Sequence, residues 1–415
     1  MSTFEFQNGE LFAENTAVSA IVEQYGSPCY IYSRTALENH YLAYANALAN
    51  TDHLICYAVK ANSNLAVLNI LAKLGSGFDI VSEGELARVI AAGGDPAKVV
   101  FSGVGKTAQE MRAALAAGIY CFNVESEAEL YLLAAVAEAE QKVAKISIRV
   151  NPDIDAQTHP YISTGLQENK FGIPIESVVP MYQFAATSAY LDVSGVDCHI
   201  GSQLTTSAPF SDALDRVLLL IDELNAAGIT LHHIDMGGGL GVCYTDEQPP
   251  SVAEYIAPLL SKLAQRNVKL ILEPGRSIAA NAGILVSKVE FLKPSPAKNF
   301  AIIDAAMNDM IRPALYQAEM RAETISPSSE TTVKTWDLVG PVCETGDFLA
   351  KNRDLALNQG DYIAFFGAGA YGFTMSSNYN SRPRPPEIIV DKNQCHLVRP
   401  REDISDLIRG EKILP

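Results

Sequence analysis

The sequence has few cysteines for its length, and none of them is spaced for a disulfide or zinc framework. Seven cysteines are spread over 415 residues, and no two form a C-x-x-C pair. An odd number of scattered cysteines is typical of reduced thiols in a cytosolic protein. We therefore expect a cytoplasmic protein with neither structural disulfides nor a bound metal.

Long hydrophobic runs are also missing. No apolar stretch is long enough to span a bilayer. The first 15 residues are acidic and lack the charged start and apolar core of a signal peptide. These absences predict a protein without a membrane segment or a secretory leader.

Positive charge is scarce. The chain has 31 lysines and arginines against 48 aspartates and glutamates, a net charge of −17. This balance argues against nucleic acid or an anionic membrane as a main partner. It does not exclude small anionic ligands, because a site can be locally positive. Nearly half of the residues are hydrophobic, so large cores can form, and the length allows two or three domains.

What the chain does contain is a regular alternation of short apolar runs and amphipathic stretches. Such a pattern predicts parallel strands separated by helices. Eight strand–helix units favour a (β/α)8 barrel, with an open doubly wound sheet as the alternative. The expected strands lie at 54–59, 78–81, 98–102, 119–124, 145–150, 193–199, 231–236 and 268–273. The expected helices include 65–74, 83–92, 108–117, 127–140, 212–227 and 252–265, and Ser82 and Glu85 resemble a capping box.

The pattern changes after about residue 278. Strand-like runs separated by turns follow, and helical periodicity is scarce until residues 403–408. We expect a barrel domain over residues 35–278 and a mostly β domain over 279–415. The segment 1–34 is also strand-like and is assigned to the β domain. The runs that predict strands there are 284–292, 300–303, 331–339, 362–366 and 387–390.

A lysine ends the first barrel strand, in the stretch Y-A-V-K-A-N around Lys60. Burial at the mouth of an apolar strand would favour the neutral amine, which can form a Schiff base with an aldehyde. The alternative is a lysine that merely extends its ammonium from a strand end into water.

Several further polar groups follow predicted strands, where barrel active sites lie. Gly237, Gly238 and Gly239 follow the seventh strand and could bring backbone N–H groups to a phosphate. They could also form a tight turn, but they lack the G-x-G-x-x-G spacing of a dinucleotide site. Glu273 could stabilise a protonated pyridine nitrogen or form an ion pair with Arg276.

His199 follows the sixth strand and could stack on an aromatic cofactor or be an ordinary core histidine. In the β domain, Cys343 lies in a Gly-rich loop beside acidic residues, Glu344 and Asp347, whose charge would favour the protonated thiol, which suits a proton donor. An incidental loop cysteine is the alternative. Tyr371 lies among glycines, and Arg312 with Tyr316 suits recognition of a carboxylate, although both could be surface residues.

Together these motifs resemble the fold-type III pyridoxal-phosphate-dependent decarboxylases, and within them the diaminopimelate branch. The resemblance runs from Tyr57 to Pro386 in the family's order. It implies a TIM-like (β/α)8 barrel of the alanine racemase type with a C-terminal, mostly β domain. Residues 159–165, followed by K-F-G at 170–172, resemble the substrate-side segment of that branch. The motifs are Y-A-V-K-A-N, F-D-I-V-S-E-G-E-L, H-I-G-S-Q, G-G-G-L-G, E-P-G-R, C-E-T-G-D and G-A-Y-G.

The resemblance also implies roles for individual residues. Lys60 would bind pyridoxal 5'-phosphate as a Schiff base, and Cys343 would return a proton after CO2 leaves. Asp79 and Arg149 would be supporting residues. The cofactor would be held by Lys60, His199, Ser202, Gly237, Gly238, Gly239, Glu273, Pro274, Gly275, Arg276 and Tyr371. The substrate would be held by Arg276, Arg312, Tyr316, Glu344 and Tyr371.

The implied activity is decarboxylation of meso-2,6-diaminopimelate to L-lysine and CO2, the last step of lysine biosynthesis. Family members place the loop cysteine and the following acid across a subunit interface, which implies a homodimer. The alternatives are a decarboxylase of ornithine, arginine or lysine and a non-catalytic relative that binds the cofactor. Glu344 with Arg312 and Tyr316 favours a substrate with both a distal amine and a distal carboxylate.

Overall fold

The chain forms two compact units in a computed structural model that describes residues 3–154, 170–327 and 331–415. The barrel unit comprises residues His40–Val242 and Gln248–Ser277. The β-rich unit comprises Met1–Asn39, Cys243–Glu247 and Ile278–Pro415. A short segment after residue 242 therefore leaves the barrel unit and returns to it.

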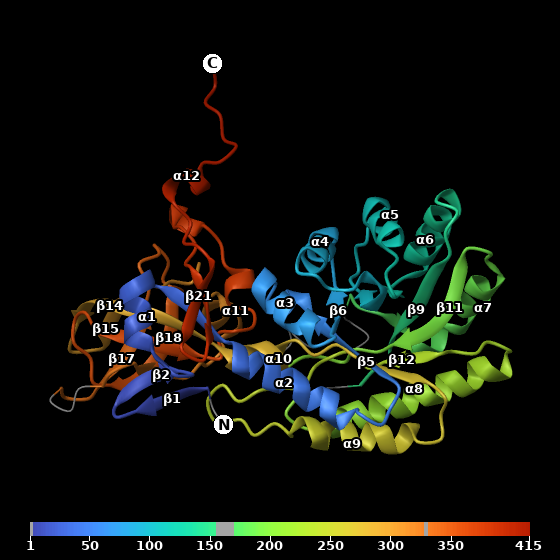
Figure 1. Ribbon diagram of the computed structural model, residues 1–415, viewed down its shortest axis with the longest axis horizontal. Helices are drawn as coiled ribbons and strands as arrows, with labels where there is room; N and C mark the ends of the chain where they lie inside the picture. Colours follow the sequence, from blue (N-terminus) through green and yellow to red (C-terminus); the bar gives the residue numbers. More distant parts are fainter. Residues whose placement is uncertain (1–2, 155–169, 328–330) are drawn as a thin grey trace. The chain divides into compact units, whose positions relative to one another are not determined.

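The barrel unit contains a closed parallel barrel of eight strands (Figure 1). Each strand pairs with its neighbours in sequence order. β9 pairs with β8, and β13 pairs with β5 to close the ring. A short strand, β10 (Ile173–Pro174), lies beside β9. The predicted barrel is confirmed, and the open sheet is not formed. The barrel strands are β5 (His53–Ala58), β6 (Gly77–Ile80), β7 (Val99–Phe101), β8 (Cys121–Val124), β9 (Ala144–Asn151), β11 (Leu191–Asp197), β12 (His233–Asp235) and β13 (Lys269–Leu272).

Helices follow the strands around the barrel, and Figure 1 shows α4, α5 and α6 one after another. Side chains cap several of them: Thr107 and Ser251 form complete capping boxes. The box predicted at Ser82 is only half formed, because Glu85 accepts from the N–H of Val81 instead of that of Ser82. The helices are α2 (Arg34–Ala47), α3 (Leu65–Lys73), α4 (Glu83–Ala91), α5 (Ala108–Ala117), α6 (Glu127–Ala139), α7 (Val179–Thr187), α8 (Ala208–Ala226) and α9 (Val252–Leu263).

The barrel interior has an apolar part and a polar part. Cys56, Val100, Cys121 and Ile271 form a small apolar cluster of buried side chains. Buried polar residues lie towards the carboxyl ends of the strands, where barrel sites form. These residues are Asp79, Asn123, Arg149, Asp197 and Asp235.

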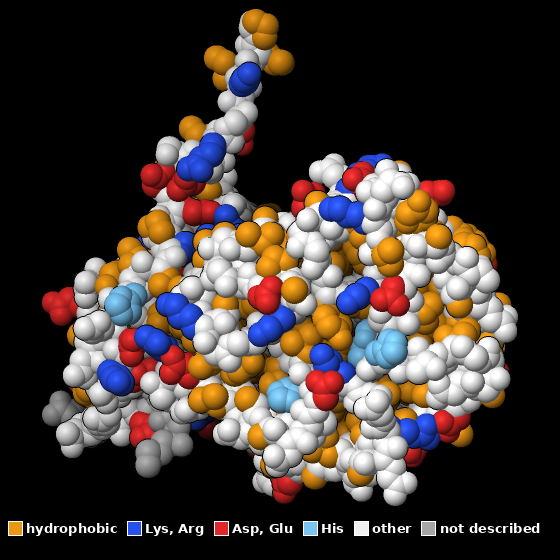
Figure 2. Space-filling view, turned by 45° about the vertical axis from the view of Figure 1, so that its right-hand side comes forward, with side chains coloured by type: hydrophobic (Ala, Val, Ile, Leu, Met, Phe, Trp, Pro, Cys, Tyr) orange, Lys and Arg blue, Asp and Glu red, His pale blue; other side chains and the backbone are white. Residues whose placement is uncertain are grey.

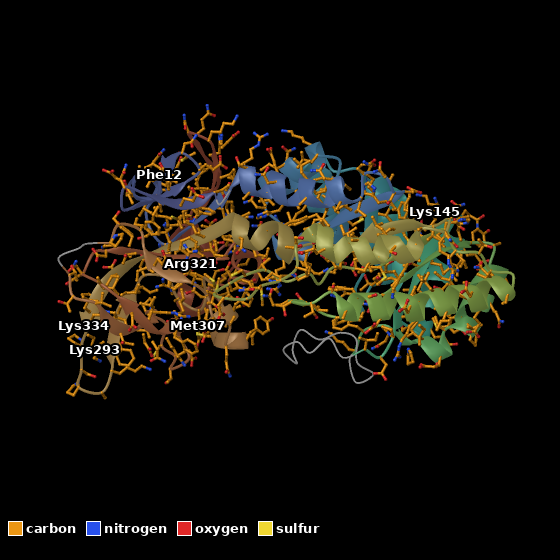
Figure 3. The ribbon with its side chains drawn as sticks, turned by 90° about the horizontal axis from the view of Figure 1, so that it is seen from below. Phe12, Lys145, Lys293, Met307, Arg321 and Lys334 are labelled. Atoms are coloured by element: carbon orange, nitrogen blue, oxygen red, sulfur yellow. The ribbon has the colours of Figure 1, made fainter. Side chains whose placement is uncertain are left out.

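The β-rich unit is built on a sheet with the order β18-β17-β15-β14-β4-β20-β21, in which β19 pairs with β14 and β16. The N-terminal strand β4 lies between β14 and β20, so the start of the chain joins strands from its end. Figure 3 labels Lys293 and Lys334, at the end of β14 and the start of β17, and Lys145 on β9. The strands of this large sheet are β4 (Cys29–Ser33), β14 (Gly283–Lys293), β15 (Asn299–Ile303), β16 (Ala322–Thr324), β17 (Lys334–Val339), β18 (Phe348–Leu355), β19 (Tyr362–Phe366), β20 (Glu387–Asp391) and β21 (Gln394–Arg399).

Smaller elements complete the β-rich unit. A separate three-stranded sheet, β1-β2-β3, precedes helix α1. Leu11, Val18, Ile31 and Ile284 belong to one buried cluster, which joins this small sheet and α1 to the large sheet. The elements are β1 (Phe4–Gln7), β2 (Glu10–Ala13), β3 (Thr16–Ala17), α1 (Val18–Tyr25), α10 (Arg276–Ala279, which begins in the barrel unit), α11 (Arg312–Tyr316) and α12 (Ile404–Leu407).

Within the described ranges, no helix combines the length and apolar character needed to cross a membrane. On the face shown in Figure 2, acidic and basic side chains are interspersed with apolar ones. The excess negative charge is therefore not gathered into one large patch on that face.

Candidate active site

Lys60 stands just after strand β5, in the short 3-10 turn Val59–Ala61. Its Nζ contacts Oδ2 of Asp79, which is fully buried on the neighbouring strand β6. The Lys60 side chain is 40% exposed, so the expectation that Lys60 is buried is wrong. Lys60 is a partly exposed lysine whose amine is paired with a buried carboxylate.

Glu273 directly follows strand β13 and is buried. Its Oε1 accepts from Ser102 Oγ at 3.3 Å and from Asn123 Nδ2 at 3.4 Å. Arg276, the alternative ion-pair partner, donates instead to Ser202 Oγ through Nε at 3.1 Å and a terminal nitrogen at 2.9 Å. Glu273 thus receives two neutral donors inside the barrel and is also hydrogen bonded to the Asp235 side chain.

Three carboxylates meet at this point. Oxygens of Asp197, Asp235 and Glu273 all lie within 4.8 Å of one another. Burial, followed by the negative charge of neighbouring carboxylates, raises the pKa of Glu273 well above its ordinary value. Burial likewise raises the pKa of Asp235 to about 6. Arg149 offsets part of this negative charge, because its guanidinium forms ion pairs with Glu125 at 3.0 Å and with Asp197 at 3.7 Å.

The glycine loop after strand β12 leaves no room for side chains. Gly237 and Gly239 have φ of +63° and +112°, which glycine adopts without strain. A Cβ on Gly238 would lie 2.4 Å from the carbonyl oxygen of Glu273, and one on Gly239 would lie 2.6 Å from that of Gly201. The backbone therefore packs directly against the loops after strands β11 and β13.

His199 belongs to the same cluster. A Cβ on Gly237 would meet the ring, and the N–H of Gly238 donates to its Nδ1 at 3.2 Å. Burial and the positive charges of Arg149 and Lys60 hold the pKa of His199 well below its ordinary value. The imidazole is therefore neutral and fixed in orientation.

Pro274 and Gly275 connect this cluster to the lysine segment. Pro274 accepts from the N–H of Ala58 at 3.1 Å. A Cβ on Gly275 would lie 2.9 Å from that of Ala58 and 3.0 Å from that of Ala61. The loops after strands β5, β11, β12 and β13 thus form one contiguous group, which we call the barrel cluster. It contains Lys60, Asp79, His199, Ser202, Gly237, Gly238, Gly239, Glu273, Pro274, Gly275 and Arg276.

The remaining predicted residues belong to the β-rich unit. Arg312 begins α11, and its guanidinium lies 4.5 Å from the ring centroid of Tyr244. Arg312 is buried, so it is not an ordinary surface residue. Tyr316 ends the same helix. Tyr371 follows β19 in a left-handed conformation with φ of +57°, between Ala370 and Gly372.

Cys343 and Glu344 lie on an exposed loop whose shape is fixed by neighbouring segments. Asp347 accepts from the N–H of Val342 at 2.7 Å and from that of Met307 at 2.7 Å. Asn380 accepts from the N–H of Cys343 at 3.0 Å. The Tyr379 hydroxyl donates to the Glu344 carboxylate. The loop is therefore held on both sides of Cys343 and Glu344.

Comparison with known proteins extends over the whole chain. Residues 34–280 match the family described as pyridoxal-dependent decarboxylase, pyridoxal binding domain. A diaminopimelate decarboxylase from Pseudomonas aeruginosa is 59% identical over 415 residues, covering all of both chains. The chain belongs to the diaminopimelate decarboxylase family.

Solved structures agree with this assignment. Diaminopimelate decarboxylase from Helicobacter pylori, complexed with L-lysine, has a TM-score of 0.91 at 42% identity and covers 94% of this chain and 98% of its own. The enzyme from M. jannaschii, in co-complex with L-lysine, has a TM-score of 0.94 at 37% identity, with coverage of 100% and 98%. The fold and the pyridoxal phosphate dependence follow from family membership.

The barrel cluster fits the family's cofactor. Lys60 would supply an amine for the aldehyde, and Glu273 would supply a buried carboxylate for the ring nitrogen. His199 offers a neutral aromatic face. The glycine loop with Arg276 provides a close-packed backbone and one cation for a phosphate.

Two parts of this decarboxylase were not anticipated from its motifs. Ser102 and Asn123, which bond to Glu273, lie outside the motifs, although each is a polar residue at the end of an apolar strand. Tyr379 and Asn380, which hold the cysteine loop, lie in a stretch without a recognisable pattern. The proposed substrate-side segment at residues 159–165 lies outside the described residues.

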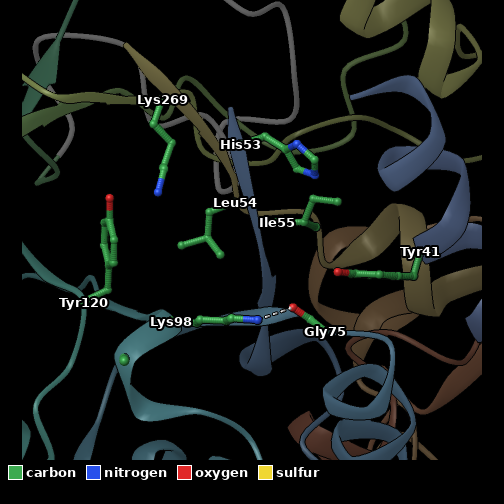
Figure 4. A pocket seen from close by; sticks show the side chains of 9 residues that line it. Tyr41, His53, Leu54, Ile55, Gly75, Lys98, Tyr120 and Lys269 are labelled. Atoms are coloured by element: carbon green, nitrogen blue, oxygen red, sulfur yellow. Dashed lines mark hydrogen bonds between the residues drawn. The ribbon is translucent and has the colours of Figure 1, made fainter. Parts of the chain in front are cut away.

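The structure also has a pocket at the opposite end of the barrel. It has a volume of about 280 Å³ and lies at the amino ends of strands β5 and β13 (Figure 4). Tyr41, His53, Lys98, Tyr120 and Lys269 contribute to its lining, and Lys98 donates to the carbonyl of Gly75. Because family sites use the carboxyl ends of the strands, this pocket is separate from the barrel cluster.

Glu85 provides a test of the electrostatics around Lys60. Burial raises its pKa to about 7, with the charges of Lys60, Asp79 and Arg88 acting nearby. The folded protein therefore holds this proton more tightly than the unfolded chain, whose glutamate titrates near its ordinary value of 4.5. Stability from this group is complete below pH 4.5 and is lost as the pH rises towards 7. We expect Glu85→Gln to gain stability relative to the wild type over that window, by about 3 kcal/mol at neutral pH.

The measurement is the thermal unfolding midpoint of wild type and variant from pH 4.5 to 7.5. Glu138→Gln, at an exposed position on α6, is the matched control and should show a constant offset. A Glu85→Gln offset that does not change with pH would contradict the assignment.

Proposed function

We propose that this protein decarboxylates meso-2,6-diaminopimelate to L-lysine and CO2 with pyridoxal 5'-phosphate, the last step of lysine biosynthesis. The observation that carries the proposal is similarity over the full length. It includes the β-rich unit, where the residues proposed to select the substrate lie. Two family relatives have structures in complex with L-lysine, which is the expected product, and this supports the proposed reaction.

The cofactor, when bound, supplies an electron sink for the pair left behind as the bond between Cα and the carboxylate breaks. Lys60 would hold it covalently through its amine, whose position is fixed by contact with Asp79. Glu273 would accept a hydrogen bond from the ring nitrogen and keep it protonated. His199 would stack on the ring and fix its plane. Gly237, Gly238, Gly239, Ser202, Pro274, Gly275 and Arg276 would complete the phosphate and ring contacts.

The β-rich unit would recognise the far end of the substrate. Arg312 is buried and carries a planar guanidinium suited to a carboxylate, with Tyr316 on the same helix. Glu344 would pair with the distal ammonium, in an orientation set by Tyr379. Arg276 and Tyr371 would contact both cofactor and substrate. Diaminopimelate carries both distal groups, whereas ornithine and lysine carry only the ammonium.

Cys343 would return a proton to Cα after CO2 leaves. We propose that the enzyme is a homodimer, in which Cys343 and Glu344 reach the site of the partner subunit. Their exposure in the single chain supports this arrangement. We also propose a cytoplasmic location, and a domain division at 35–278 against 1–34 with 279–415.

Direct turnover tests the proposal. The purified protein, loaded with pyridoxal phosphate, is incubated with meso-diaminopimelate and, in parallel, with ornithine, lysine and arginine, and CO2 and amine products are quantified. We expect lysine from diaminopimelate and no comparable product from the others. Turnover of the other substrates alone would contradict the roles of Arg312, Tyr316 and Glu344. Turnover of none, with the cofactor still bound, would point to a binding protein.

A further inference from the structure

We propose that Ser102 and Asn123 are positioning residues that hold Glu273 as a carboxylate aimed at the ring nitrogen of the cofactor. The inference rests on the proposed role of Glu273. Both residues lie at carboxyl ends of neighbouring strands, β7 and β8, and both donate to the same oxygen, Oε1. We assign the other oxygen, Oε2, to the ring nitrogen.

The two donors form a small fixed network. Asn123 Nδ2 also donates to Ser102 Oγ at 3.1 Å, so the hydroxyl hydrogen of Ser102 is directed towards Glu273. Ser102 and Asn123 are both buried. A rigid carboxylate is needed here because a misdirected oxygen would lose the hydrogen bond to the ring.

The orientation of the Asn123 amide is unfavourable for its own oxygen. Its Oδ1 is buried and has no hydrogen-bond partner among the described residues. Leaving a buried acceptor unpaired is unfavourable. The reverse orientation would set that oxygen against the Glu273 carboxylate, which is worse. The amide is therefore oriented with its N–H groups towards two carboxylates, Glu273 and Asp235, rather than to satisfy its own oxygen.

The surroundings of Glu273 explain why donors are required. Asp79, Asp197 and Asp235 all disfavour a negative charge on Glu273, as does burial. A proton shared between Glu273 and the ring nitrogen would then remain on the carboxyl group. Two donors that stabilise the carboxylate shift that proton to the ring nitrogen, where it makes the ring a better electron sink.

Cofactor binding tests this without relying on turnover. The apo-protein is titrated with pyridoxal phosphate and with 1-deazapyridoxal phosphate, an analogue in which the ring nitrogen is replaced by CH. The ratio of the two dissociation constants reports the interaction with the ring nitrogen alone. We expect Ser102→Ala and Asn123→Ala each to lower the wild-type preference for pyridoxal phosphate by about five- to tenfold, with binding of the analogue nearly unchanged.

Control variants make the outcome specific. Ser147→Ala removes another buried hydroxyl, on strand β9, that is not bonded to Glu273, and should keep the wild-type ratio. Ser102→Thr retains the hydroxyl and should restore it. Unchanged binding of the analogue also shows that a variant is folded.

Two results would overturn the inference: equal weakening of both ligands, which indicates a general structural role, or an unchanged ratio in both alanine variants. Glu273→Ala separates this failure from failure of the proposed function. If Glu273→Ala abolishes the preference while the Ser102 and Asn123 variants keep it, only the positioning role is wrong. If Glu273→Ala also keeps the preference, the assigned partner of the ring nitrogen is wrong.

Discussion

Lys60→Ala is expected to abolish covalent capture of pyridoxal phosphate and to lower kcat by about 10³-fold or more. The reason is geometric as well as chemical. Lys60 is the amine at the end of strand β5, and its contact with Asp79 fixes the position of that amine. An alanine variant can still bind the cofactor through the glycine loop and Glu273, but it cannot hold the cofactor covalently.

Borohydride reduction followed by peptide mass measurement would detect the adduct on the peptide that contains Lys60. Lys60→Arg keeps a positive charge beside Asp79 and should lose the adduct as completely as the alanine variant. Lys98→Ala, which removes a lysine at the opposite end of the barrel, should retain both adduct and turnover. A full adduct on Lys60→Ala would assign the covalent role to another lysine.

Cys343→Ser is expected to lower kcat by about 10²- to 10³-fold while cofactor binding stays unchanged. A hydroxyl is a much weaker acid than a thiol, so it returns a proton to carbon slowly. The loop itself should keep its shape, because Asp347 and Asn380 bond to its backbone and not to the Cys343 side chain.

The chain provides a matched control. Cys243 is also exposed, and Cys243→Ser should leave kcat within about twofold of wild type, as surface substitutions usually do. Measurements are the rate of lysine formation and the dissociation constant of pyridoxal phosphate for both variants. Equal rates for Cys343→Ser and wild type would remove Cys343 from the reaction.

The sequence predicted the barrel well because a buried parallel strand has to be continuously apolar. The stretches that became β5 and β13 were recognisable from this requirement, whereas β11, which reads L-D-V-S-G-V-D, meets it less well. Strands at the margins of the β-rich sheet were harder. β18 reads F-L-A-K-N-R-D-L and β21 reads Q-C-H-L-V-R, and both carry exposed polar side chains. A sheet edge needs little apolar surface, so composition alone does not reveal it.

The site residues likewise include some that the sequence could predict and some that it could not. Lys60, His199 and Glu273 follow apolar strands and were recognisable from position and motif. Ser102 and Asn123 depend on which strand ends become neighbours, which the barrel register alone determines. The exposure of Lys60 was missed because its burial was judged from the strand before it. The turn Val59–Ala61 takes the side chain out of the strand instead.

The position of β4 has a consequence for the order in which the protein can fold during synthesis. This strand is made among the first 33 residues, but its neighbour β20 comes roughly 350 residues later. At roughly 5–20 residues per second, β4 waits roughly 20 to 70 s for that partner. The barrel strands and β14, which pairs with the other edge of β4, are complete before then, so a newly made chain carries a finished barrel and a β4 with one open edge. An open strand edge invites pairing with other chains, so the ribosome-bound stage is a period when this protein is exposed to aggregation.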